Sequence, residues 1–124
     1  MNGLIAVAAG GAIGASLRYV VTLAFARGGS TAFPWHTFGV NVIGAFALGL
    51  LMAVLPEGEA AEQWRLFIGV GLLGGFTTFS TFSYEAISLA QQGDWLTAAG
   101  YVLASVSAAL IGAGVGHTIG RALV

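Results

Sequence analysis

The chain has 124 residues, of which 57% are hydrophobic and only 7% are charged, and its mean hydropathy is +0.90. Because a water-soluble domain usually has about a quarter of its residues charged, this composition is typical of a protein embedded in lipid. The net charge of −1 excludes a basic nucleic-acid-binding surface, and the absence of cysteine excludes disulfides, thiol catalysis and thiolate metal sites.

Four apolar runs follow one another along the chain, separated by polar breaks at Arg27–Pro34, Pro56–Arg65 and Gln91–Asp94. Each run is close to the ~20 residues that a helix needs to cross the hydrocarbon of a bilayer. We therefore expect an all-α membrane protein with a single transmembrane domain over residues 1–124. The first run is interpreted as a span of the mature protein and not as a signal peptide, because no basic cluster precedes it. The predicted spans are residues 4–26, 37–55, 66–90 and 96–119.

Tryptophan opens three of the predicted spans, at Trp35, Trp64 and Trp95. Its amphipathic ring favours the headgroup level, which supports these three helix starts. The four arginines are divided equally between the two predicted sides, so the charge bias that usually orients a membrane protein is nearly absent. Such a chain is expected to insert in both directions and to form an antiparallel dimer, although so few charges leave a single orientation equally open.

The first span carries glycines at four-residue spacing, and one arginine, Arg18, lies in its later part. Small residues at this spacing let helix backbones approach closely in lipid. Arg18 either raises the local potential for anions or caps a helix end or a broken segment, and the structural role is slightly favoured. In the second span, Asn41 places amide donors in an apolar setting, where an interhelical hydrogen bond is the plain alternative to a binding role.

The third span contains the most unusual segment, Gly74–Ser83, in which two adjacent glycines are followed by five hydroxyl residues. This composition is poor for a helix interior and predicts a break in the middle of the membrane, where freed backbone groups need protein, water or an ion as partners. Phe79 and Phe82 follow at a spacing that places them on one helix face, and ring edges can contact an anion without trapping it. Glu85, one turn further, is interpreted as a proton carrier, a vestibule residue or a structural acceptor.

The fourth span adds hydroxyls at Tyr101 and Ser105, spaced to lie on one face. Each alone is more often structural. Together with Asn41 and the broken third span they supply hydrogen-bond donors without fixed cations, which suits rapid passage of a small anion. His36 and His117 are far apart in sequence and are interpreted as interfacial residues, not metal ligands.

Three motifs in order resemble the signatures of the Fluc (CrcB) fluoride channel family: Gly10–Tyr19 (GGAIGASLRY), Gly39–Gly44 (GVNVIG) and Gly74–Ser83 (GGFTTFSTFS). The resemblance covers essentially the whole chain. It implies a fluoride-selective channel that exports fluoride passively and lowers its toxicity, and not an enzyme. It also implies a multi-pass protein of the bacterial inner membrane that functions as an antiparallel, dual-topology homodimer.

By the matching positions, the resemblance makes Phe79 and Phe82 the pore phenylalanines and Asn41 the pore asparagine. Backbone carbonyls of Gly74 and Thr77 would bind a structural Na⁺ at the dimer interface, the one cofactor implied. The expected partners are fluoride, a second copy of the chain and the lipid bilayer. Further residues expected in or near the fluoride pathway are Ser80, Thr81, Tyr101, Ser105 and Glu85. The outer part of the fourth span departs from the family, because Ala108, Ala109, Gly112 and Ala113 stand where hydroxyl residues often continue.

The main alternative is a small proton-coupled multidrug exporter, which also has four spans and dual topology. That class relies on a carboxylate in the first span, whereas here the first span has Arg18 and the membrane acid, Glu85, lies in the third. A structural membrane subunit is a second alternative, but it leaves the hydroxyl-rich break without a role.

Overall fold

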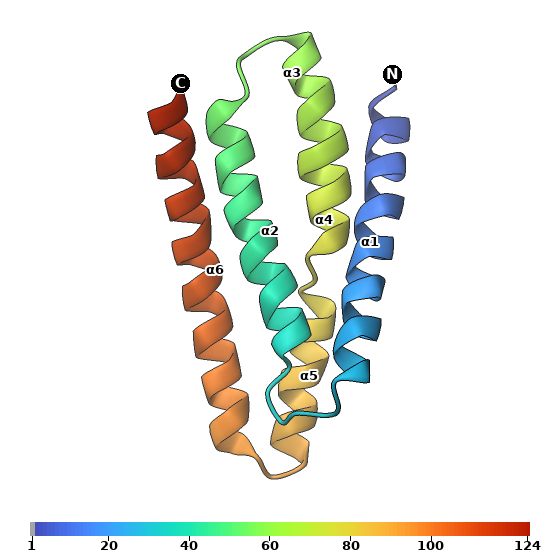
Figure 1. The fold of residues 1–124 in the computed structure, drawn as a ribbon, viewed down its shortest axis with the longest axis vertical. Helices are drawn as coiled ribbons and strands as arrows, with labels where there is room; N and C mark the ends of the chain where they lie inside the picture. The colour runs from blue at the N-terminus through green and yellow to red at the C-terminus, as the bar shows by residue number, and fades with distance from the viewer. Residues whose placement is uncertain (1) are drawn as a thin grey trace.

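The computed structural model describes residues 2–124, which fold into helices joined by short loops (Figure 1). Four helical stretches are long and apolar enough to cross a membrane, which confirms the predicted all-α fold. The third stretch is interrupted, as its composition predicts. The elements are α1 (Gly3–Arg27), α2 (Trp35–Val54), a third span made of α3 (Glu59–Trp64), the π-helix η1 (Arg65–Leu73), α4 (Gly74–Phe76) and α5 (Ser80–Gln91), and α6 (Trp95–Leu123).

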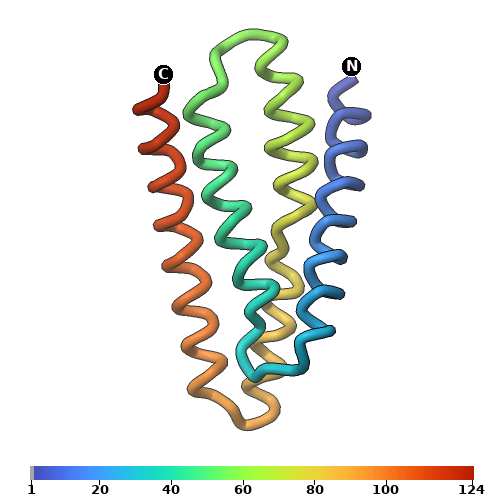
Figure 2. Tube along the Cα trace, viewed as in Figure 1, coloured from blue at the N-terminus to red at the C-terminus, as the bar shows by residue number. Residues whose placement is uncertain are grey.

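The four spans lie side by side in the order α6, α2, third span, α1 across the broad face of the molecule (Figures 1 and 2). Both termini and the α2–α3 connection lie at one end, and the other two loops lie at the opposite end. α1 packs along η1 and α4, whereas α2 packs along α6. The chain is therefore built from two helix pairs that contact each other less extensively.

Polar residues set several helix ends. Asn2 Oδ1 accepts the N–H of Leu4 at 2.8 Å and so caps α1, and Asp94 Oδ1 accepts the N–H of Thr97 at 3.2 Å and caps α6. Gly93, with φ of +83°, makes the turn between α5 and α6, a conformation that side chains with a Cβ disfavour. Trp35 and Trp95 begin α2 and α6 as predicted.

The helix start predicted at Trp64 is wrong, because the third span begins at Glu59, where α3 starts. Glu59–Trp64 (EAAEQW) consists largely of good helix formers, and its acidic residues favour the positive end of the helix dipole. Arg65, which follows α3, connects the helix to the preceding loop, since its Nη2 donates a hydrogen bond to the carbonyl of Pro56 at 2.9 Å. Polar composition marked this segment as a loop although it is helical.

Each helix pair is held together along a seam, meaning a line of glycines at which the two helix backbones touch. Gly10 and Gly14 of α1 face the backbone of the third span so closely that a Cβ on either would overlap the carbonyl oxygen of Phe67 or Leu72. In the second pair, a Cβ on Gly116 of α6 would overlap the carbonyl oxygen of Phe46. The four-residue glycine spacing thus marks interfaces where helix backbones touch, as small residues do in membrane proteins generally.

Candidate functional site

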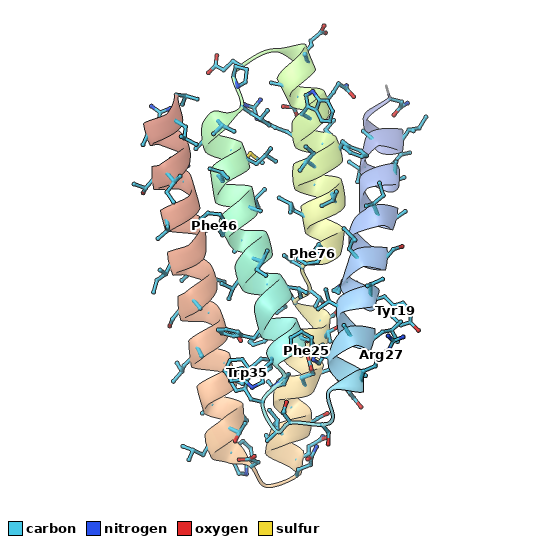
Figure 3. All side chains as sticks on the ribbon, viewed as in Figure 1. Tyr19, Phe25, Arg27, Trp35, Phe46 and Phe76 are labelled. Atoms are coloured by element: carbon cyan, nitrogen blue, oxygen red, sulfur yellow. The ribbon has the colours of Figure 1, made fainter. Side chains whose placement is uncertain are left out.

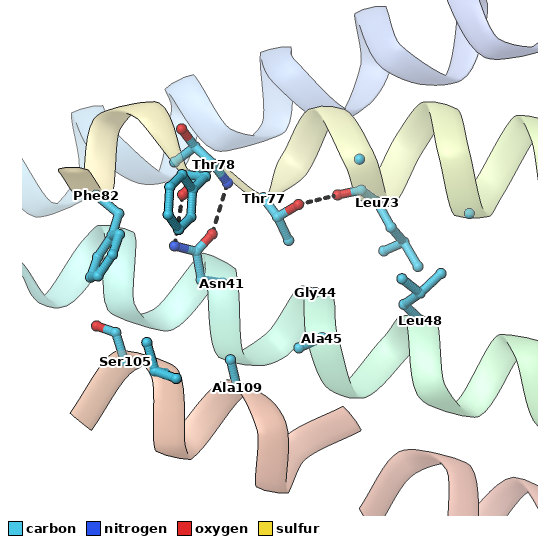
Figure 4. A pocket seen from close by; sticks show the side chains of 14 residues that line it. Asn41, Gly44, Ala45, Leu48, Leu73, Thr77, Thr78, Phe82, Ser105 and Ala109 are labelled. Atoms are coloured by element: carbon cyan, nitrogen blue, oxygen red, sulfur yellow. Dashed lines mark hydrogen bonds between the residues drawn. The ribbon is translucent and has the colours of Figure 1, made fainter. Parts of the chain in front are cut away.

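An open cavity of about 340 Å³ lies between α2, the third span and α6, at the level of the break (Figure 4). Apolar side chains make up much of its wall, but the polar groups that face it come from all three spans. Its lining residues are Asn41, Gly44, Ala45, Leu48, Gly69, Leu73, Gly74, Thr77, Thr78, Phe79, Phe82, Ser105, Val106 and Ala109. The cavity therefore brings together predicted site residues from the second, third and fourth spans.

Asn41 is paired with the backbone of the break. Its Nδ2 donates to the carbonyl of Thr78 at 2.9 Å, and its Oδ1 accepts the N–H of Thr78 at 2.7 Å (Figure 4). One amide thus satisfies both backbone groups of a residue that lies between two helices. Because Nδ2 carries two hydrogens, one donor of Asn41 remains beyond this pair. The interhelical hydrogen bond expected as the plain role of Asn41 is present.

Thr78 begins the second half of the third span. Its Oγ1 accepts the N–H of Thr81 at 3.1 Å, the contact that a capping hydroxyl makes with the first turn of a helix. The hydroxyl of Ser80 lies 3.4 Å from the same oxygen. Ser80 is exposed, whereas Thr81 is half-buried. The hydroxyl-rich sequence therefore supplies the new helix start from within the membrane span.

These contacts leave two carbonyls without their usual helical donors. In a continuous helix the carbonyl of Gly74 accepts the N–H of Thr78, but that N–H donates to Asn41 Oδ1. Likewise, the carbonyl of Thr77 loses the N–H of Thr81, which donates to Thr78 Oγ1. Both Gly74 and Thr77 line the cavity. The break thus places two residues whose carbonyls have lost their usual donors beside an open space within a membrane span.

Arg18 of α1 supports the break from the opposite side. Its Nε donates to the carbonyl of Gly75 at 3.2 Å, at the end of α4. Gly75 also lies against the backbone of α1, where a Cβ would be 2.7 Å from the carbonyl oxygen of Gly11. The positive charge of Arg18 therefore lies at a carbonyl near the end of α4, and Arg18 caps the broken segment.

The two phenylalanines have different surroundings, although their ring centroids are 5.7 Å apart. Phe79 lies in the break and is 78% exposed, whereas Phe82 is buried against Tyr101, with ring centroids 5.1 Å apart. The Ser105 side chain projects from α6 toward Phe82 (Figure 4). Ser105 is 5% exposed, and its hydroxyl oxygen has no hydrogen-bond partner within residues 2–124. Such a buried hydroxyl is costly without a partner, which points to a ligand or a water.

Glu85 is the centre of a polar cluster one turn beyond Phe82. Its Oε1 accepts the hydroxyl of Thr37 at 2.6 Å and that of Tyr101 at 3.3 Å. Its Oε2 lies 3.5 Å from Nε2 of His36. Three spans thus converge on one carboxylate, which explains how a charged group is tolerated within a membrane helix.

Sequence reasoning missed two members of this cluster. Thr37 precedes Asn41 by four residues on α2, so the two side chains share a helix face, and this spacing was a usable signal. His36 was assigned to the interface as an isolated residue, and nothing near it in sequence indicates Glu85 as its neighbour. Across the described residues 2–124, no group of three or more His, Cys, Asp or Glu side chains is arranged to hold a metal ion.

Comparison with known proteins gives a consistent result over nearly the whole chain. Residues 5–117 match the model of a family described as CrcB-like protein, Camphor Resistance (CrcB). A "Fluoride-specific ion channel FluC" from Chloroflexus aurantiacus is 46% identical over 122 residues, which cover 98% of this chain and 97% of that protein. Proteins of the same name from Idiomarina loihiensis and Sphingopyxis alaskensis are similar. The first is 54% identical over 100 residues, covering 81% of this chain and 78% of its own length. The second is 46% identical over 124 residues, covering 99% and 98%.

Proposed function

The chain belongs to the CrcB-like family of fluoride-specific ion channels, and we propose that it exports fluoride passively through a pathway completed by a second copy of itself. The observation that carries this proposal is the cavity at the break, where donors without fixed cations gather. The multidrug-exporter alternative is set aside, because the family is that of fluoride channels. Neutral HF crosses a bilayer and loses its proton in a near-neutral cytoplasm, so the trapped anion needs a route down its own gradient.

A homodimer is supported by the shape of the single chain. The four spans lie side by side (Figure 1), and the cavity at the break is open and not enclosed by one chain. Phe79, which lines this cavity, is 78% exposed, although an aromatic pair usually packs closely. A second copy would cover the open cavity. The nearly absent charge bias favours insertion in both directions, so we propose that the two copies are antiparallel.

The proposed fluoride pathway follows the polar groups of the cavity and of the Glu85 cluster. The spare amide hydrogen of Asn41 and the unpartnered hydroxyl of Ser105 would donate to fluoride, and the ring edges of Phe79 and Phe82 would line the path with weak positive potential. Several weak sites replace the hydration shell and still release the ion. The remaining proposed members are Ser80, Thr81, Tyr101 and Glu85.

A structural Na⁺ fits the carbonyls of the break. Gly74 and Thr77 both line the cavity, and the N–H groups that usually satisfy their carbonyls donate to side chains instead. Carbonyl oxygens are ligands suited to a hard cation, and two from each of two copies would supply four oxygens. When bound, Na⁺ would be coordinated by these carbonyl oxygens and would stabilise the contact between the two copies. It would not take part in fluoride movement.

Withdrawal of Na⁺ is expected to weaken the dimer. When purified channel is exchanged into a buffer with N-methyl-D-glucamine as the cation, we expect both the dimer fraction on size exclusion and the fluoride flux to fall, and Na⁺ to restore both. The paired measurement is the sodium content of the purified dimer by atomic emission. An exchanged sample that contains no sodium and yet remains dimeric and active would contradict the site at Gly74 and Thr77.

Flux from liposomes tests the channel function itself. Reconstituted protein should release trapped fluoride once a potassium ionophore removes the opposing potential, and it should not release chloride, because the larger ion does not fit the narrow pathway. Fluoride and chloride electrodes follow the two ions. Fluoride release no faster than from protein-free liposomes would refute the function. A flux that needs a pH gradient, and that Glu85→Gln abolishes, would instead indicate a coupled carrier.

A further inference from the structure

A second cavity, of about 570 Å³, lies at the end of the molecule where the α1–α2 loop covers the start of α2. Phe25 and Trp35, which both line it, lie at this loop end (Figure 3). Within the described part of the chain, His36 and Glu85 are the two ionisable side chains that line this cavity. Both are partly accessible, with 29% of the His36 side chain and 18% of the Glu85 side chain exposed. Protons from water can therefore reach this pair.

The two oxygens of Glu85 have different partners. Oε1 takes the hydroxyls of Thr37 and Tyr101, which are 1% and 0% exposed, so neither hydroxyl can turn to bulk water. If the carboxylate moves away, both donors need another acceptor, because a buried hydroxyl without a partner is costly. In an anion pathway that acceptor is the transported ion. Glu85 thus competes with fluoride for two donors.

His36 approaches Glu85 from the other side. Its Nε2 lies 3.5 Å from Oε2 of Glu85, which is longer than the roughly 2.7–2.9 Å of a charge-assisted hydrogen bond. The ring of Phe25 of α1, which carries no charge, also lies near the His36 ring, at a centroid distance of 6.2 Å. The ionisable residues of α1 (Arg18, Tyr19 and Arg27) do not line this cavity, and from α6 the ionisable group in the cluster is Tyr101. Among the ionisable residues that line this cavity, Glu85 is therefore the one that the charge of His36 faces.

We propose that His36 is a positioning residue whose protonation draws the Glu85 carboxylate away from Thr37 and Tyr101 and thereby opens these two donors to fluoride. This inference rests on the proposed function. Histidine is the side chain that ordinarily changes charge between pH 5 and 8. A protonated His36 gains a charge-assisted bond to Oε2 and offsets the negative charge that repels an anion at this cavity. Fluoride flux through this channel therefore rises as the pH falls through the range in which a histidine ordinarily gains its charge.

Fluoride efflux from liposomes at equal internal and external pH tests this proposal. Measurements at about pH 5.5 and about pH 7.5 bracket the usual titration of histidine, and flux from protein-free liposomes is subtracted at each pH to remove HF leak. Equal pH on both sides makes the result independent of the orientation of each copy. We expect the flux to be about tenfold higher at the lower pH, which is the lower end of the effect of one hydrogen bond to a charged group.

His36→Gln keeps an amide donor near Glu85 but cannot titrate, so its flux should be the same at both pH values. His117→Gln, the matched change at the other histidine, should keep the wild-type pH profile. Glu85→Gln, which removes the competing charge, should also give a flat profile. Wild-type flux that is measurable and equal at the two pH values would overturn the role of His36, as would a His36→Gln profile like the wild type. Absence of fluoride flux at both pH values would instead refute the channel function.

Discussion

Asn41→Asp is expected to reduce fluoride flux by about 100-fold, which corresponds to roughly 3 kcal/mol of added barrier. The substitution keeps the oxygen that accepts the N–H of Thr78 but replaces the Nδ2 that donates to the Thr78 carbonyl. A carboxylate oxygen would then face a carbonyl oxygen at the break. The new negative charge would also repel an anion in the cavity that Asn41 lines. Efflux from liposomes measures the flux, and size exclusion in detergent checks that the dimer still forms.

Asn2→Asp is the matched control for this change. Asn2 caps α1 through Oδ1, which accepts the N–H of Leu4, and an aspartate caps a helix equally well. The same chemical substitution outside the membrane should therefore leave the flux within about twofold of the wild type, since both residues make this cap. If Asn41→Asp formed dimers and conducted fluoride at the wild-type rate, Asn41 would have no part in the pathway, and its hydrogen bonds would be structural alone.

Hydrophobic length and composition were enough to predict the spans, because lipid requires long apolar helices and leaves few alternatives. The break was predictable for a related reason, since Gly74–Ser83 combines adjacent glycines with hydroxyls that compete for backbone partners. The true start of the third span, at Glu59 and not at Trp64, was not predictable, because the segment from Glu59 is both polar and strongly helix-forming. In such a segment, polarity indicates exposure to water and not the absence of a helix.

The π-helix η1 (Arg65–Leu73) could not be predicted from the spacing of apolar residues either. It requires the N–H of Gly74 to bond the carbonyl of Gly69, five residues earlier, and a short apolar run has no pattern that separates this turn from an α-helical one. Pairings between distant residues were equally hidden. Asn41 and Glu85 were recognised as polar groups in apolar spans, but their partners Thr78 and His36 became evident only when the helices were placed side by side.

Gly14→Ala is expected to destabilise the folded channel by at least about 2 kcal/mol, as overpacking of a tight interface does. A Cβ at Gly14 would overlap the carbonyl oxygen of Leu72 and would lie 2.8 Å from the backbone nitrogen of Phe76. These are backbone atoms, so no side chain can rotate to make room and α1 must move away from the third span. Arg18, one turn later on α1, would then lose its bond to the carbonyl of Gly75, and the break would lose its cap.

Gly11→Ala separates this close approach from the general effect of replacing a helical glycine. The nearest atom to a Cβ at Gly11 is the carbonyl oxygen of Gly71 at 3.9 Å, an ordinary contact, so alanine should be tolerated there and its higher helix propensity adds a small stabilisation. Thermal unfolding in detergent, followed by tryptophan fluorescence, together with the yield of dimer, compares the two variants. A Gly14→Ala protein as stable as Gly11→Ala would mean that the seam between α1 and the third span is wider than described. The support that Arg18 gives to the break would then not depend on glycine at this position.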